Sequence, residues 1–189
     1  MKKKHNLTVF VIILALVAGL LYMQDSARST EPAPTVVDAL KATVAGIELA
    51  YPANYGVYEK TNSPVTKTLS TVVWYENTES NKSFFTGGAN APSEPPVTMS
   101  LDVYSNPSNL SPKELLGNDA AYMFAKSSGA PVVVGGIQGT LLEWDGLYKG
   151  KSVMVNHKGL LYVFSMTSIT NEDTILSDFD LLISSIIFK

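Results

Sequence analysis

Two carboxylates, Glu143 and Asp145, flank Trp144 in a segment whose composition favours a β-strand. Residues two apart in a strand project to the same face of the sheet, so these two side chains are predicted to be neighbours. Paired carboxylates can act as acid and base in catalysis. The alternative is a solvated polar face opposite a buried Trp144, and we favour this simpler interpretation.

The remaining reactive side chains are few and scattered. The chain has no cysteine, which excludes disulfides, a thiol nucleophile and a cysteine-based metal site. Of the two histidines, His5 lies in the N-terminal tail and His157 in a predicted hairpin turn, so they cannot form a zinc site together. Gly135, Gly136 and Gly139 do not match a dinucleotide-binding fingerprint, because a strand follows them. No catalytic residue, cofactor or metal is therefore predicted, and the chain is not expected to be an enzyme.

The N-terminus predicts a membrane location. Lys2, Lys3 and Lys4 precede an apolar run over residues 7–23 in which only Thr8 is polar. A run of this length lies at the short end of what spans a bilayer, and the preceding lysines favour a cytoplasmic N-terminus. Residues 1–24 are therefore predicted to be a signal anchor that forms a single-pass transmembrane helix in the cell membrane, with the rest of the chain extracytoplasmic.

A cleaved signal peptide remains the alternative for the same segment. The apolar run is long for a signal peptide, and no cleavage site of the small-residue type follows it. The missing cysteine also excludes a lipid-anchored lipoprotein. Cleavage would make the protein secreted rather than anchored.

Charge and composition divide the rest of the chain. Residues 25–34 are polar and contain two prolines, which is typical of a tether. We assign residues 25–43 to this tether, with a short helix possible over 35–43, and residues 44–189 to one domain. Without the three leading lysines the chain carries 11 basic and 17 acidic residues, a net charge of −6 that does not favour nucleic acid or anionic lipid.

Alternating apolar residues and turn signals predict an α+β domain. Strands are expected near residues 44–51, 57–60, 68–76, 97–104, 139–148, 151–156 and 160–168, with the last three joined as an antiparallel meander. Ser111, Pro112 and Glu114 form a capping box that begins a middle helix, and Asn171 is expected to cap a last one. Residues 77–96 are predicted to be a long exposed loop with Phe84 and Phe85 in its middle. The expected fold is an antiparallel β-sheet flanked by helices.

Two short motifs resemble a known superfamily. Tyr51-Pro52-Ala53-Asn54-Tyr55 after the first strand, the capped middle helix, the meander and the terminal Ser184-Ser185-Ile186-Ile187-Phe188 together resemble the Mog1/PsbP-like superfamily, especially small bacterial membrane-anchored PsbP-related proteins. The resemblance covers roughly residues 46–189. It implies an α/β/α sandwich and a non-catalytic role in binding a protein partner, although the partners of PsbP and Mog1 cannot be transferred to this chain.

The sequence thus predicts a membrane-tethered extracytoplasmic binding or scaffolding domain with an unidentified protein partner. Tyrosine is abundant in its first part, and tyrosine is common at interfaces because its ring buries area while its hydroxyl stays hydrated. Partner contacts are accordingly predicted at Tyr51, Tyr55, Phe84 and Phe85, although Phe84 and Phe85 could instead fold back onto the domain. The alternatives are a small-molecule carrier with a pocket between sheet and helix, or an enzyme that uses Glu143 and Asp145.

Overall fold

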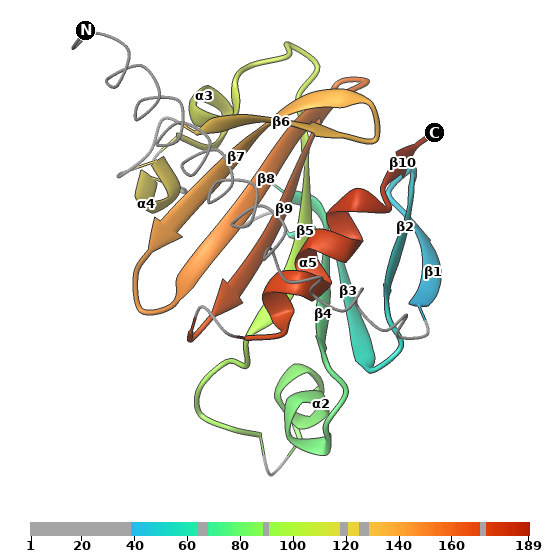
Figure 1. The fold of residues 1–189 in the computed structure, drawn as a ribbon, viewed down its shortest axis with the longest axis vertical. Helices are drawn as coiled ribbons and strands as arrows, with labels where there is room; N and C mark the ends of the chain where they lie inside the picture. Colours follow the sequence, from blue (N-terminus) through green and yellow to red (C-terminus); the bar gives the residue numbers. More distant parts are fainter. Residues whose placement is uncertain (1–38, 64–67, 89–90, 118–120, 125–128, 171–172) are drawn as a thin grey trace, which may run out of the picture. The chain divides into compact units, whose positions relative to one another are not determined.

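The computed structural model describes residues 39–63, 68–88, 91–117, 121–124, 129–170 and 173–189 (Figure 1). The predicted anchor at residues 1–24 and the tether up to residue 38 lie outside the described residues. Among those that are described, no helix is long and apolar enough to cross a membrane.

Most of the described chain forms a seven-stranded antiparallel sheet with the order β3-β4-β5-β9-β8-β7-β6. Its strands are β3 (Tyr55–Ser63), β4 (Thr68–Glu76), β5 (Thr98–Ser105), β6 (Ala130–Val134), β7 (Ile137–Asp145), β8 (Lys149–His157) and β9 (Leu160–Ser168). The predicted meander is confirmed, since β7 pairs with β8 and β8 with β9. Strand β6 was not predicted.

A second, three-stranded sheet has the order β1-β2-β10 and is also antiparallel. It consists of β1 (Ala39–Val44), β2 (Ile47–Pro52) and β10 (Ile187–Phe188). The prediction of a helix over residues 35–43 is wrong for residues 39–43, which form β1, and the folded part begins before the predicted Val44. A tight turn causes this difference: Ala45 and Gly46 adopt φ angles of 48° and 81°, so the chain reverses and β1 pairs with β2.

Helix α2 (Glu79–Thr86) replaces part of the loop predicted over residues 77–96. Thr78 caps its start by accepting a hydrogen bond from the Asn81 backbone N–H at 3.2 Å. Gly87 ends it in the left-handed region at φ 71°. The polar composition of the segment concealed this helix, which is stabilised by its caps and by aromatic packing against the sheet.

The predicted middle helix is divided into α3 (Pro112–Leu116) and α4 (Ala121–Phe124). Its capping box is confirmed, with Ser111 and Glu114 bonded reciprocally. Helix α3 ends because Gly117 leaves the helical region with φ 55° and ψ −134°. The last helix, α5 (Ile175–Ser184), is present as predicted, but Asn171 lies outside the described residues and the N-cap position is Thr174, whose side chain makes no capping bond.

Helices cover both faces of the seven-stranded sheet. On one face, α5 and β2 pack onto the sheet around a large apolar core, and Figure 1 shows α5 running across this face. On the other face, Leu116 of α3 and Met123 of α4 pack with the buried Leu142, Met154 and Leu161. The architecture is therefore α+β with mostly antiparallel strands, as predicted.

Candidate functional site

The early aromatic motif belongs to the core. Tyr51 is 9% exposed and its ring lies 6.1 Å from that of the fully buried Trp74. Tyr55 is 7% exposed and its hydroxyl donates to Asp178 of α5 at 2.8 Å. Burial and this hydrogen bond together raise the pKa of Tyr55. Both predicted contact residues therefore join the sheets to the core and to α5, with little ring surface left for a partner.

Phe84 and Phe85 lie on α2 and are half-buried. Phe85 stacks on Tyr75 with ring centroids 4.6 Å apart and also packs against Tyr58 at 5.4 Å. Phe84 meets Phe85 edge-on at 5.2 Å. The pair thus folds back onto the sheet, which is the alternative considered from the sequence. A partner contact through their remaining exposed surface stays a prediction.

The C-terminal motif holds the two sheets together. The Ser185 hydroxyl accepts a hydrogen bond from the Ala50 backbone N–H at 2.7 Å, which continues the pairing of β2 beyond β10. Phe188 packs against Tyr162 at 5.3 Å and against His157 at 4.9 Å. His157 is thus the last residue of β8 rather than a solvated turn residue. In the motif, Ser185 thus bonds to the backbone of β2, and Phe188 packs onto side chains of β8 and β9.

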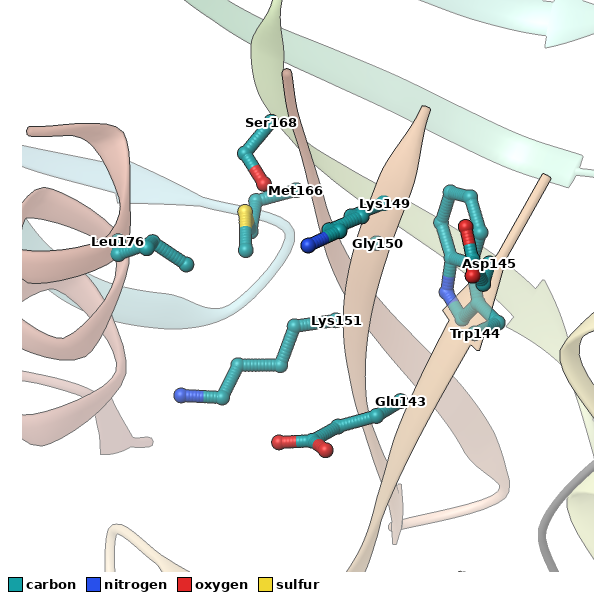
Figure 2. A pocket seen from close by; sticks show the side chains of 9 residues that line it. All are labelled: Glu143, Trp144, Asp145, Lys149, Gly150, Lys151, Met166, Ser168 and Leu176. Carbon is teal, nitrogen blue, oxygen red and sulfur yellow. The ribbon is translucent and has the colours of Figure 1, made fainter. Parts of the chain in front are cut away.

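A pocket of about 460 Å³ lies between the β7–β8–β9 meander and the first turn of α5. Glu143 and Asp145 both contribute to its wall. Figure 2 shows the Glu143 and Lys151 side chains extending toward the side on which Leu176 of α5 lies. The pocket is lined by Glu143, Trp144, Asp145, Lys149, Gly150, Lys151, Met166, Ser168 and Leu176.

Strand register arranges the charges of this pocket in two rows. Glu143 of β7 is directly opposite Lys151 of β8, and Asp145 is directly opposite Lys149. The Lys151 ammonium also pairs with Asp180 of α5 at 2.9 Å. An acidic row therefore runs along β7 and a basic row along β8. Each carboxylate has a cationic neighbour, an arrangement that the sequence alone did not reveal.

Trp144 lies on the opposite face of the sheet, where it is half-buried. Its ring covers Gly150, since a Cβ atom at that position would lie only 2.0 Å from the ring atom Cζ2. Its indole N–H donates to the Ser152 hydroxyl at 3.0 Å, and Ser152 is hydrogen-bonded to Ser165 at 2.8 Å. Trp144 therefore supports the pocket wall from behind.

Two strongly exposed aliphatic residues are close in the chain to residues that line the pocket. Leu147 is 92% exposed in the β7–β8 turn, and Ile169 is 67% exposed directly after β9. The Gly146 N–H bonds to the Tyr148 carbonyl at 3.0 Å, which closes the turn. The Asp173 carboxylate accepts hydrogen bonds from the backbone N–H groups of Ile169 and Thr170, at 2.7 and 3.0 Å. Both aliphatic side chains are thus held outward on well-bonded backbone, and we call them the apolar rim.

Asp173 is fixed electrostatically as well as geometrically. The Thr170 hydroxyl also donates to this carboxylate at 2.6 Å. Hydrogen bonds from Thr170, and then from the Ile169 N–H, hold the pKa of Asp173 below its ordinary value. The charged form of the carboxylate is therefore favoured, and it is this form that accepts the bonds from Ile169 and Thr170.

Other candidate sites are less developed. A pocket of about 320 Å³ lies beside β1 and β2 and is lined in part by Lys41, Glu48 and Ser185. In the described part of the chain, no group of three or more His, Asp or Glu residues could hold a metal ion. Gly135 and Gly136 form the β6–β7 turn with φ angles of 53° and 81°, so they serve a hairpin.

Comparison with known proteins identifies the fold only. No protein-family model matches the chain, and no curated protein gives a significant match. The solution structure of cyanobacterial PsbP (CyanoP) from Synechocystis sp. PCC 6803 is similar with a TM-score of 0.50 and 16% identity, covering 83% of this chain and 96% of that one.

Two further solved structures are similar at lower TM-scores. A crystal structure from Bacteroides thetaiotaomicron VPI-5482 has a TM-score of 0.46 and 11% identity, covering 80% of this chain but only 48% of that one. LpqN of Mycobacterium tuberculosis has a TM-score of 0.36 and 13% identity, covering 82% and 92%. With the CyanoP match, the described domain has a PsbP/Mog1-like fold, as the resemblance implied.

Proposed function

We propose that this chain is a non-catalytic binding domain of the cell envelope. In this proposal residues 1–24 form a membrane anchor, the segment up to residue 38 is a tether, and the folded domain lies on the extracytoplasmic side. The leading lysines and the apolar run of residues 7–23 support the anchor and its orientation. The PsbP/Mog1-like fold supports a binding role, because the family resemblance implies a domain that binds a partner protein.

The observation that carries the proposal is the charged pocket with its apolar rim. Exposed aliphatic side chains on a soluble surface often mark contact sites when they border a concave, polar region. Leu147 and Ile169 are close in the chain to residues that line such a region, and local hydrogen bonds fix the β7–β8 turn and the backbone at Ile169. A backbone that is already ordered loses little conformational entropy on binding.

Site-specific photo-crosslinking in native membranes tests this contact surface. A photoreactive residue is placed at position 147 or 169 of the full chain, and the matched control is Val133, an aliphatic residue that is 61% exposed near the opposite end of the sheet. We expect a defined adduct at positions 147 and 169 and none at 133. The same labelling at all three positions would contradict the proposal.

Membrane topology is tested separately. Alkaline carbonate washing should leave the full chain in the membrane fraction, because a spanning helix resists extraction whereas peripheral association does not. In a separate sample of sealed, right-side-out vesicles, external protease should digest the domain. Release of the intact chain by carbonate would refute the anchor without affecting the contact surface.

A second candidate function is acid–base catalysis by the two pocket carboxylates. It is favoured by one observation, that Glu143 and Asp145 share a pocket wall. A Glu143→Gln and Asp145→Asn double variant tests it, with Glu59→Gln on the exposed edge strand β3 as the control. An activity lost in the double variant and kept in the control would replace the non-catalytic proposal.

A further inference from the structure

We propose that the pocket between β7, β8 and α5 binds a short zwitterionic peptide, with the peptide ammonium group on the acidic row of β7 and its carboxylate on the basic row of β8. This inference rests on the proposed binding function of the domain but is independent of the membrane anchor.

The two charged rows match the two ends of a dipeptide. Neighbouring strands lie about 4.8 Å apart, and alternate residues on one strand are about 6.7 Å apart. The charged ends of an extended dipeptide are separated by roughly 6 Å. A ligand with both charges can therefore lie across the strands, whereas a ligand with one charge meets a repelling row as well as an attracting one.

The existing ion pair leaves room for such an exchange. Lys151 has its side chain 23% exposed, but its partner Asp180 is 65% exposed. An exposed ion pair contributes little to stability because water and salt screen it. A ligand carboxylate can therefore take the place of Asp180 beside Lys151 at small cost to the fold.

The pocket lining includes one hydroxyl group, that of Ser168, next to the apolar side chains of Met166 and Leu176. Ser168 is 1% exposed, and Figure 2 shows its hydroxyl directed toward Met166 and the pocket. Met166 is 3% exposed and Leu176 is half-buried. The hydroxyl is placed to bond a peptide amide or carboxylate, and the volume of about 460 Å³ falls in the range of small-ligand sites.

The apolar rim indicates which peptides bind best. Leu147 lies two residues from both Asp145 and Lys149, and Ile169 directly follows Ser168, which pairs with Lys149, so both lie at the same end of the sheet as these pocket-lining residues. Burying their exposed surface under apolar ligand side chains is favourable. Peptides with aliphatic side chains are therefore preferred over those with polar ones.

Calorimetric titration of the full chain in a mild detergent tests the inference. The probes are leucyl-leucine and three blocked forms of it, one acetylated at the amine, one amidated at the carboxylate and one blocked at both ends. We expect leucyl-leucine to bind, each singly blocked form to bind at least about tenfold more weakly, and the doubly blocked form not to bind, since each charged contact contributes about that factor.

Charge-neutralising variants assign the two rows. Glu143→Gln should weaken the binding of leucyl-leucine but leave the affinity for its amine-blocked form unchanged. Lys149→Gln should also weaken the binding of leucyl-leucine but leave the affinity for the carboxylate-blocked form unchanged. The matched controls are Glu59→Gln and Lys60→Gln on β3, at the far edge of the sheet. Both controls should bind leucyl-leucine like the parent chain.

Several results would overturn the inference. They are a Kd for leucyl-leucine weaker than about 1 mM, equal affinity for the blocked forms, or equal weakening in the β3 controls. If the crosslinks at positions 147 and 169 form while leucyl-leucine fails to bind, the ligand assignment is wrong and the proposed function survives. If leucyl-leucine binds but carbonate releases the chain, only the anchor is wrong.

Discussion

Replacing Gly150 with alanine should destabilise the domain through the ring of Trp144. In the structure a Cβ atom on residue 150 would lie 2.0 Å from Trp144 Cζ2 and 2.2 Å from both Cε2 and Cη2. The strand backbone is fixed by β7 and β9 on either side, so the ring must move away. That movement also breaks its 3.0 Å hydrogen bond to Ser152.

The expected cost combines two effects. Overpacking a well-filled site costs typically about 1–3 kcal/mol, and a lost hydrogen bond adds about 1 kcal/mol. We therefore expect Gly150→Ala to lower the free energy of unfolding by roughly 2–4 kcal/mol. For a domain of this size, a change near 3 kcal/mol lowers Tm by about 6–12 °C.

Urea unfolding of the full chain in mild detergent, followed by far-ultraviolet circular dichroism, measures this cost. Gly146→Ala is the matched control, because the nearest atom to a Cβ at Gly146 is 3.9 Å away. In a Trp144→Ala background, Gly150→Ala should cost less than about 1 kcal/mol, since the clash is gone. Equal costs in both backgrounds would refute the assignment of the effect to Trp144.

Three further predictions concern stability. Phe85→Ala should cost about 2 kcal/mol because it removes the stack on Tyr75; hydrogen exchange should then accelerate in α2 first, and uniform acceleration would contradict a local role. Burial raises the pKa of Asp102 above its ordinary 3.8, so the contribution of Asp102 to stability is complete below that pH and is lost as pH rises. The Asp102→Asn substitution should therefore change the free energy of unfolding more favourably near neutral pH than at about pH 3. A difference of opposite sign in urea unfolding would refute this. The pKa of Tyr55 is raised by burial and by Asp178 above its ordinary 10.0, so stability is complete below about pH 10 and falls above it by up to about 1.4 kcal/mol per pH unit. Tyr55→Phe should cost about 1–2 kcal/mol at neutral pH and remove that part of the alkaline loss, and an unchanged alkaline slope would count against it.

Local signals in the sequence predicted most of the elements correctly. The alternation over residues 97–104 gave a strand whose Met99, Leu101 and Val103 are buried, as expected from a period of two. The capping box at Ser111 and Glu114 is present because its hydrogen bonds form within one turn of helix. Such features depend on neighbouring residues only, so they can be read without a fold.

Errors occurred where packing or pairing between elements decides the structure. Helix α2 has a polar sequence, and the stacking of its Phe85 on Tyr75 of β4 holds it against the sheet. The segment at residues 39–43 is a strand because β2 pairs with it. The burial of Tyr51 and Tyr55 was also not foreseen, because it results from the packing of β2 and β3 with α5, more than 100 residues later in the chain; their contact with a partner stays a prediction.

By itself, the sequence determined the apolar N-terminal segment, the acidic character of the remainder and the side-by-side placement of Glu143 and Asp145, because composition and strand periodicity are local properties. Only the tertiary structure placed Lys151 and Lys149 opposite those carboxylates, brought Leu176 of α5 to the pocket and left Leu147 and Ile169 exposed. The physical reason is that register and burial are set by the packing of whole strands and helices, and a shift of one residue would turn each side chain to the other face.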